Sequence, residues 1–315
     1  MIAEAHRSFD CFGGTAAVHV RGADTAGGEQ AADRARSQLL DAHRSLSRFI
    51  EDSELSRLNR DPRWRVPASP LMLGLAVAVV LAGSHSGGLV DATLLGSLER
   101  VGYRESLGQH RQASLADALC SQPERMLGKP DPSARWRSVQ VDEAMATIVR
   151  PPGVRIDSGG IAKGMVADLL AATLQEQPTY AVDCCGDLRV GGTAGLERKV
   201  LVDDPFGGLP IHELVLREGA AATSGIGRRC WIGPDGRAAH HILDPRTGRP
   251  AFTGIVQVSA VAPSALIAEV YAKSALLSGA DHAPDWLPHG GVLVYDNGEV
   301  DVVSAERPLT ETAAP

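Results

Sequence analysis

The stretch VRIDSGGIAKGMVADLL, residues 154–170, decides how the rest of the chain is interpreted. A short apolar segment, expected to be a strand, ends at Asp157, and a Ser-Gly-Gly turn leads into a helix that carries Lys163 and Asp168. The first N–H groups of such a helix lack intrahelical partners and lie at the positive end of its dipole. The stretch therefore predicts either an anion site, to which Lys163 adds a full charge, or merely a tight connection.

Composition limits the possible partners. The chain has 315 residues with 31 basic and 38 acidic side chains, and no basic cluster, so nucleic acid is not expected as a partner. Its most apolar run, residues 71–82, is shorter than the ~20 residues that a bilayer span needs. The N-terminus lacks the apolar region of a signal peptide, and the five cysteines form no CxxC pair. We expect a cytoplasmic protein with no membrane partner.

Hydrophobic periodicity predicts strands and helices that interleave along the whole chain. Helices are expected at 28–50, at 71–82 after Ser69-Pro70, at about 160–174 and at 264–277. A further short helix is expected to begin after Ser53, which would cap it. Strands are expected at 15–21 after a flexible 11–14 entry, at 180–190 with an interruption at Gly186-Asp187, and at 199–202, 212–217 and 256–262. Hairpins are expected at 138–150 and 291–303, a polar excursion at about 104–137, and a disordered tail at 306–315. The small residues 220–225 would let the backbone approach a ligand closely. These elements predict an α+β fold with a single compact body, residues 1–305, of mixed or antiparallel sheets and packed helices.

Seven motifs carry a resemblance that covers most of the chain. They are DSELSRLN at 52–59, VDATLLG at 90–96, IDSGGIAKG at 156–164, CGDLRVGG at 185–192, ATSG at 222–225, HHILDPRTGRP at 240–250 and APSALIAE at 262–269. In this order and spacing they resemble the FAD:protein FMN transferase family, also called ApbE-like or thiamine-biosynthesis-lipoprotein-like. The resemblance implies a T-fold-like body.

The resemblance also implies an activity and a set of site residues. The family moves FMN from FAD onto a threonine or serine hydroxyl of a target flavoprotein and releases AMP, with a magnesium ion at the pyrophosphate. His241 matches the histidine that activates the acceptor hydroxyl. The positions expected to contact FAD are Gly13, Phe49, Leu89, Val90, Asp91, Asp157, Gly159, Lys163, Thr223, Ser224 and Ile242.

The residue chemistry agrees with these roles. A pyrophosphate at the Gly159-Gly160 turn would be held by helix N–H groups and by Lys163. A neutral imidazole at His241 can accept a hydroxyl proton, because the unperturbed pKa of histidine is about 6.5. Asp244 and Thr247 are expected to shape the loop after His241. The adjacent Cys184 and Cys185 are expected to pack as small residues, since neighbouring cysteines form a disulfide only with strain.

The chain departs from the family at the metal site. The family's ligands are a backbone carbonyl, here that of Gly160, and an Asp and a Thr one helical turn apart, where this chain has Glu269 and Lys273. Glu followed by Lys four residues later is the favourable order for an ion pair on one helix face. A charged lysine cannot ligate a cation. Either the ammonium of Lys273 contacts the pyrophosphate in place of the metal, or Glu269 binds a displaced magnesium ion while Lys273 turns away.

Three functions stay open at this point. The first is an FAD-dependent transferase with FAD as substrate, His241 as the general base and an acceptor Thr or Ser on a target flavoprotein. The second is a protein that has lost transfer and keeps FAD as a bound cofactor. The third is an FAD pyrophosphatase, or a transferase with a small-molecule acceptor, because water or another hydroxyl could replace the threonine.

Overall fold

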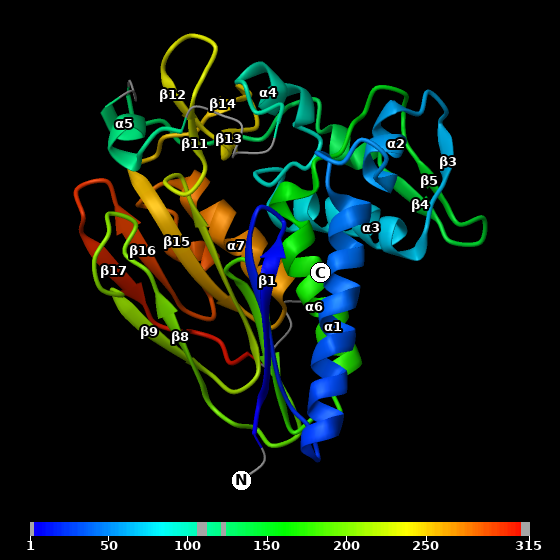
Figure 1. The fold of residues 1–315 in the computed structure, drawn as a ribbon. Helices are drawn as coiled ribbons and strands as arrows, with labels where there is room; N and C mark the ends of the chain where they lie inside the picture. The colour runs from blue at the N-terminus through cyan, green and yellow to red at the C-terminus, as the bar shows by residue number, and fades with distance from the viewer. Residues whose placement is uncertain (1–2, 106–111, 121–123, 310–315) are drawn as a thin grey trace.

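An antiparallel sheet of eight strands forms the centre of the protein, in the order β1-β2-β6-β7-β10-β15-β16-β17 (Figure 1). The computed structural model describes residues 3–105, 112–120 and 124–309. The strands are β1 (Ala5–Cys11), β2 (Gly14–Arg21), β6 (Thr179–Cys184), β7 (Asp187–Gly191), β10 (Gly219–Gly225), β15 (Ile255–Ala262), β16 (Gly291–Tyr295) and β17 (Val300–Val303). Every neighbouring pair is antiparallel, so the predicted α+β class is confirmed.

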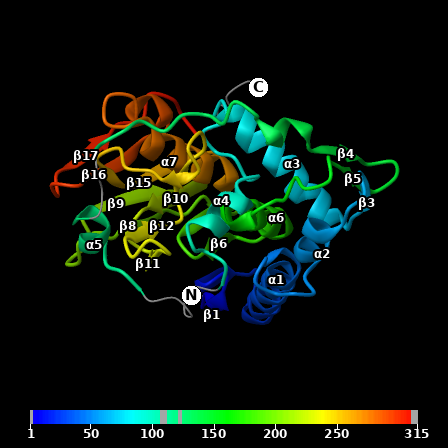
Figure 2. The same cartoon turned by 90° about the horizontal axis from the view of Figure 1, so that it is seen from above.

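Three helices cover one face of this sheet: α1 (Thr25–Leu46), α6 (Ala162–Leu174) and α7 (Ala265–Ser278). Seen from above, they follow one another across the sheet, with α3 (Pro70–His85) packed against them (Figure 2). Alternate residues of β10, including Ala220 and Ala222, face these helices and are fully buried. Because α7 lies between the sheet and α3, it is buried almost all round, and its sequence shows little amphipathic pattern.

The opposite face of the sheet is covered by a hairpin of β8 (Arg198–Val202) and β9 (His212–Leu216). Val200 and Leu214 of the hairpin pack against the cluster that contains Ala221 and Val261 of the sheet.

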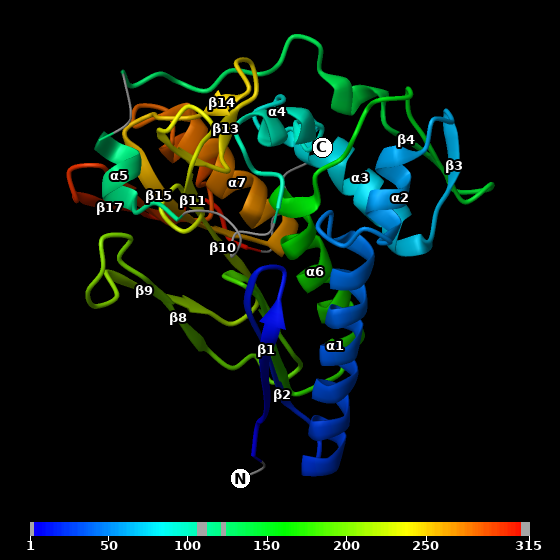
Figure 3. The same cartoon turned by 45° about the horizontal axis from the view of Figure 1, so that its top comes forward.

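Smaller elements surround the ends of the main layers. The β3-β5-β4 sheet lies beside α2 and α3, while α4 and the short hairpins β11–β12 and β13–β14 gather near α7 (Figure 3). Their bounds are α2 (Glu54–Arg60), β3 (Arg65–Pro67), α4 (Leu95–Arg100), α5 (Leu115–Cys120), β4 (Gln140–Asp142), β5 (Thr147–Val149), β11 (Cys230–Ile232), β12 (Ala238–His240), β13 (Leu243–Asp244) and β14 (Arg249–Pro250). Within the described ranges, 3-10 turns complete them at η2 (Arg135–Ser138), η3 (Ser158–Gly160) and η4 (Pro284–Trp286).

Local sequence signals located the starts of α2 and α3. Ser53 accepts a hydrogen bond from the amide of Ser56, and Ser69 accepts one from the amide of Met72, which confirms both predicted caps. The helix that begins at Pro70 runs past Gly83 to His85, beyond its predicted end. Glycine is needed there, since a Cβ on Gly83 would lie 2.3 Å from the ring of Trp136. Helix α4 was not predicted.

Several predicted segments differ from the structure. Residues 154–157 are not a strand, for they pair with no other strand and are held by the contacts described below. Residues 11–14 are not a flexible entry; Phe12 and Gly13, both with positive φ, form the two-residue turn between β1 and β2. Residues 220–225 lie in the central strand β10, where small residues let α7 pack closely. The helix predicted at 28–50 is α1, which begins earlier, at Thr25, because Asp24 caps it, and which ends earlier, at Leu46.

Other predictions fall partly on residues outside the described ranges. Of the predicted excursion at 104–137, residues 106–111 and 121–123 lie outside them, and so do residues 310–315 of the predicted tail. The domain span of 1–305 stays a prediction. Within the described ranges, no helix is long and apolar enough to cross a membrane.

Candidate active site

A cavity of about 740 Å³ opens where α1, the start of α6, the end of α7 and the loop after β12 meet. Most of the predicted site residues line it: Gly13, Phe49, Leu89, Val90, Asp91, Asp157, Gly159, Gly160, Lys163, His241, Ile242 and Lys273. The structure thus brings together residues from nearly the whole length of the chain. Thr223, Ser224 and Glu269 are not among the lining residues.

The Ser-Gly-Gly turn is fixed by contacts from three other segments. Asn59 of α2 exchanges two hydrogen bonds of 2.8 Å with the backbone of Ile156. The amide of Asp157 donates to the carbonyl of Ala92 at 2.8 Å, and the hydroxyl of Ser158 donates to the carbonyl of Leu46 at 2.7 Å. The turn therefore keeps its shape without belonging to a sheet, and α6 begins behind it with no side-chain cap.

Four charged side chains, which we call the lysine wall, lie behind and beside this turn: Lys163, Asp187, Glu269 and Lys273. Lys163 forms an ion pair with Asp187, and its Nζ lies 3.6 Å from Oε1 of Glu269. Lys273 Nζ donates to the same Oε1 at 3.0 Å, so the predicted pair on α7 is confirmed. The two carboxylate side chains are 0–1% exposed, and those of the lysines are 11% and 14% exposed. The ammonium groups therefore lie between the buried acids and the cavity.

Burial and the neighbouring charges shift the pKa values of the two acids of the lysine wall in opposite directions. Burial, together with the charge of Glu269, raises the pKa of Asp187 to about 7. Burial alone would raise the pKa of Glu269 as well, but Lys273 and Lys163 outweigh it and lower that pKa to about 2. The carboxylates likewise raise the pKa of Lys163 against the effect of burial. Lys163 and Glu269 are therefore charged at neutral pH.

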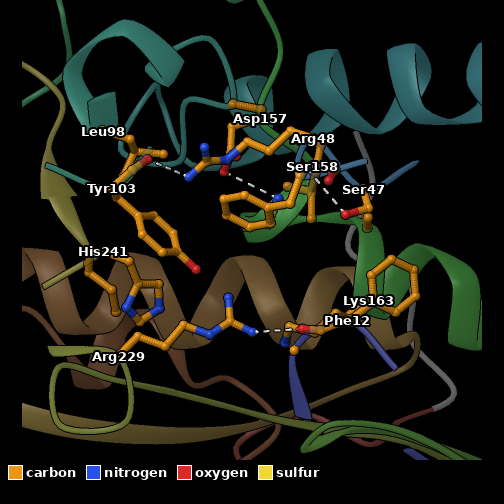
Figure 4. A pocket seen from close by; sticks show the side chains of 18 of the residues that line it. Phe12, Ser47, Arg48, Leu98, Tyr103, Asp157, Ser158, Lys163, Arg229 and His241 are labelled. Carbon is orange, nitrogen blue, oxygen red and sulfur yellow. Dashed lines mark hydrogen bonds and ion pairs between the residues drawn. The ribbon is translucent and has the colours of Figure 1, made fainter. Parts of the chain in front are cut away.

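Across the cavity lies a second group, the aromatic wall, made of Arg48, Phe49 and Tyr103, which line the cavity, and of Trp231, which contacts Tyr103. Figure 4 shows Arg48 and Tyr103 of this wall. The guanidinium of Arg48 lies 4.1 Å from the ring centroid of Phe49 and 4.6 Å from that of Tyr103. Tyr103 stacks on Trp231 with 4.8 Å between centroids. Arg48 also forms a 2.8 Å ion pair with Asp157, so this wall is joined to the glycine turn.

His241 lies on the loop between β12 and β13, near Tyr103 and Arg229 (Figure 4). Burial and then the positive charge of Arg229 hold the pKa of His241 well below its usual range. Its Nδ1 is buried with no hydrogen-bond partner among the described residues. The imidazole is therefore neutral at pH 7 and can accept a proton. As expected, Asp244 shapes the following loop by accepting from the amides of Lys129 and Arg246.

Asp91 lines the cavity with one carboxylate oxygen still available. Its Oδ1 accepts hydrogen bonds from the amide and the hydroxyl of Thr93, at 2.7 and 2.5 Å. Its Oδ2 is buried without a partner in the described part of the chain, and burial raises the pKa of Asp91. Such an acceptor suits a hydroxyl or amino group of a ligand.

Two of the predicted FAD contacts lie outside the cavity lining, on β10. Thr223 is exposed on the face of the sheet that points away from the helices, and its hydroxyl lies 2.7 Å from that of Ser259. Ser224 is buried on the helix side. Their contact with FAD stays a prediction.

The residues present do not fit the magnesium ion that the resemblance implies. Of the two expected ligands, Glu269 has Oε2 occupied by the amide of Gly164 at 3.1 Å and Oε1 shared by two ammonium groups. Magnesium requires oxygen ligands in octahedral array, and a neighbouring ammonium repels it. In the residues that the structure describes, no group of three or more His, Cys, Asp or Glu side chains is placed to hold a metal ion.

Sequence reasoning missed Arg48, Tyr103, Asp187 and Arg229. Asp187 belongs to the quoted motif 185–192 and Arg48 precedes the predicted contact Phe49, so their charges were a usable signal. Arg229 and Tyr103 lie in stretches without a motif, and only the tertiary fold brings them to the cavity. All five cysteines are free, which agrees with the packing role expected for Cys184 and Cys185.

Comparison with known sequences gives one family and a consistent set of relatives. A sequence model described as the ApbE family matches residues 12–295. The FAD:protein FMN transferase of Haemophilus influenzae is 24% identical over 312 residues, which cover 92% of this chain and 86% of the relative. That of Escherichia coli K12 is 23% identical, covering 88% and 79%.

Solved structures share the fold. The ApbE protein of Thermotoga maritima superimposes with a TM-score of 0.77 at 24% identity, covering 95% of this chain and 97% of that one. The apo form of the flavinyl transferase ApbE of Pseudomonas stutzeri gives 0.74 at 20% identity, covering 99% and 98%.

Proposed function

This chain belongs to the ApbE family, and from that premise we propose that it is an FAD:protein FMN transferase. The observation that carries the proposal is the single cavity in which a neutral imidazole, His241, shares the lining with the ammonium groups of Lys163 and Lys273. A base for a hydroxyl and a cationic site for a diphosphate are the two things that this reaction needs.

The transfer step exchanges one phosphorus–oxygen bond for another. The acceptor hydroxyl oxygen attacks the FMN-side phosphorus of FAD, and the bond from that phosphorus to the bridging oxygen breaks. The electron pair of that bond goes to the phosphate of the departing AMP. The hydroxyl proton goes to His241, whose lowered pKa keeps it unprotonated before the reaction.

The other lining residues supply binding and position. The lysine wall stabilises the diphosphate charge and the charge that develops on the leaving AMP. Phe49 and Tyr103, whose ring centroids lie 5.4 Å apart, offer aromatic faces to a planar ring of FAD. Asp91 offers its unpartnered oxygen to a donor on the ligand. Correct placement of both reactants lowers the entropy cost of the reaction.

Incubation of the protein with FAD separates the protein transferase from the pyrophosphatase and from the protein that keeps FAD as a bound cofactor. One sample contains an acceptor flavoprotein of a related transferase, such as that of Haemophilus influenzae, and a second contains water as the only acceptor. AMP release together with flavinylation in the first sample alone is the result we expect. AMP and free FMN in both samples would indicate a pyrophosphatase, and tight FAD binding without AMP would indicate a bound cofactor.

The expected cytoplasmic location stays a prediction.

A further inference from the structure

The feature that the proposed function leaves unexplained is Lys273, which occupies the place beside the glycine turn where a metal ion is expected. Its Cε lies 3.4 Å from the position of a Cβ built on Gly160, so the lysine stem packs directly against the turn. Its ammonium group is held by Glu269, which also contacts Lys163. Two cations therefore share one anchored carboxylate at the cavity wall.

From this arrangement, and resting on the proposed function, we propose that Lys163 and Lys273 bind the diphosphate of FAD as a metal-free anion. An ammonium group has three donors. Lys163 donates to Asp187 and lies 3.6 Å from Oε1 of Glu269, and Lys273 donates to Glu269, which leaves donors of both lysines for phosphate oxygens. Charge-assisted bonds of this kind are the strong ones in a site shielded from water.

The charge of the wall supports the same conclusion. When both acids are ionised, they cancel the two ammonium charges. Arg229, which also lines the cavity, adds a further positive charge. The lysines and Arg229 therefore present positive charge to an anion without recruiting a metal ion.

The first test uses the unaltered protein and calorimetric titration with FAD, in EDTA and in excess magnesium chloride. We expect the same dissociation constant in both, within about twofold. Binding that is more than about tenfold tighter with magnesium would overturn the proposal.

The second test removes the charge of Lys273. In Lys273→Met we expect FAD and ADP to bind roughly ten- to a hundredfold more weakly, since one charge-assisted hydrogen bond is lost. Riboflavin, which has no diphosphate, should bind as before. Lys199→Met is the matched control, because Lys199 is exposed on β8, pairs with Glu213 and does not line the cavity. Equal weakening of riboflavin and FAD would contradict the assignment.

The third test replaces the Glu269–Lys273 pair by the Asp and Thr that the family has at these two positions. Glu269→Asp combined with Lys273→Thr should make FAD binding stronger with magnesium than with EDTA, and an unchanged response would count against the proposal. Should this variant not fold, the titration of the unaltered protein still decides.

Metal-free binding of FAD without AMP release would refute the transferase function alone. AMP release combined with FAD binding that requires magnesium would refute the metal-free site alone.

Discussion

The lysine wall and the aromatic wall of the cavity are built in different ways. Lys163, Asp187 and Glu269 come from α6, β7 and α7, which belong to the central sheet and the helices packed on it. Arg48 and Phe49 follow α1, Tyr103 follows α4, and these segments lie outside the main layers. The buried acids are 0–1% exposed, whereas Phe49 is 40% exposed.

Because of this difference, the two walls are suited to different parts of a ligand. Charges fixed inside a packed layer lose little entropy on binding and suit a diphosphate, which every dinucleotide carries. Phe49, the exposed ring of the aromatic wall, can adapt to the shape of a planar group and adds little to folding stability, whereas Tyr103 and Trp231 are buried in a small hydrophobic cluster. We therefore expect changes in the lysine wall to affect folding and charge recognition, and a change at Phe49 to affect ring recognition alone.

The largest expected effect concerns His241, which belongs to neither wall. His241→Ala should lower the rate of FMN transfer by about 10²–10⁴-fold, the usual contribution of a general base, while FAD affinity stays close to that of the unaltered protein. Transfer is measured as AMP release, and affinity by titration with FAD. His282→Ala, at an exposed site, is the control. Retained turnover in His241→Ala would remove this residue from the mechanism.

Breaking the lysine wall should be costly to folding. Glu269→Ala leaves two ammonium groups and the amide of Gly164 without their shared acceptor, so the free energy of unfolding should fall by about 3–5 kcal/mol. Urea unfolding followed by circular dichroism measures it. The control Glu213→Ala removes a largely exposed ion pair and should cost about 0–1 kcal/mol. Equal losses in the two variants would show that the wall is not a structural unit.

Removal of Phe49, the exposed ring of the aromatic wall, should weaken ligand binding and leave folding stability nearly unchanged. Phe49→Ala should weaken FAD binding by about two- to tenfold, because one aromatic contact is lost, with little change in the unfolding midpoint. Trp64→Ala removes an aromatic ring that is 59% exposed and does not line the cavity, and should leave FAD binding unchanged. Comparable losses of FAD affinity in the two variants would contradict the assignment of Phe49.

The smallest effect is one of pH. Because burial and Arg229 lower the pKa of His241, its imidazole should stay neutral as the pH falls through the ordinary histidine value of about 6.5. In the ligand-free protein, the NMR signal of His241, assigned by its loss in His241→Ala, should not titrate there. The exposed His282 supplies the comparison. A midpoint near 6.5 for His241 would show that the loop opens to water.

Local patterns predicted the parts of this site that depend on neighbours in sequence. The caps at Ser53 and Ser69 follow from side chains that reach the next turn of the same helix, and the Glu269–Lys273 pair follows from their spacing of four. The glycine turn before α6 was recognisable for the same reason, although the segment that ends at Asp157 is not the strand that its apolar residues indicated.

What could not be predicted depends on the packing of distant segments. The ion pair of Lys163 with Asp187 requires α6 to lie on β7, and that of Arg48 with Asp157 requires the end of α1 to meet the turn. Stacking of Tyr103 on Trp231 likewise joins two segments that no motif connects. Most of the residues that the resemblance named line the cavity, but only the structure shows that Glu269 is enclosed by lysines.

A crystal structure of the protein with FAD, grown in magnesium chloride, tests the account most directly. We predict Nζ of Lys163 and of Lys273 within about 3 Å of diphosphate oxygens, with Glu269 still bound to Lys273 and no metal ion between them. A magnesium ion that bridges Glu269 and the diphosphate, with Lys273 turned away, would contradict it.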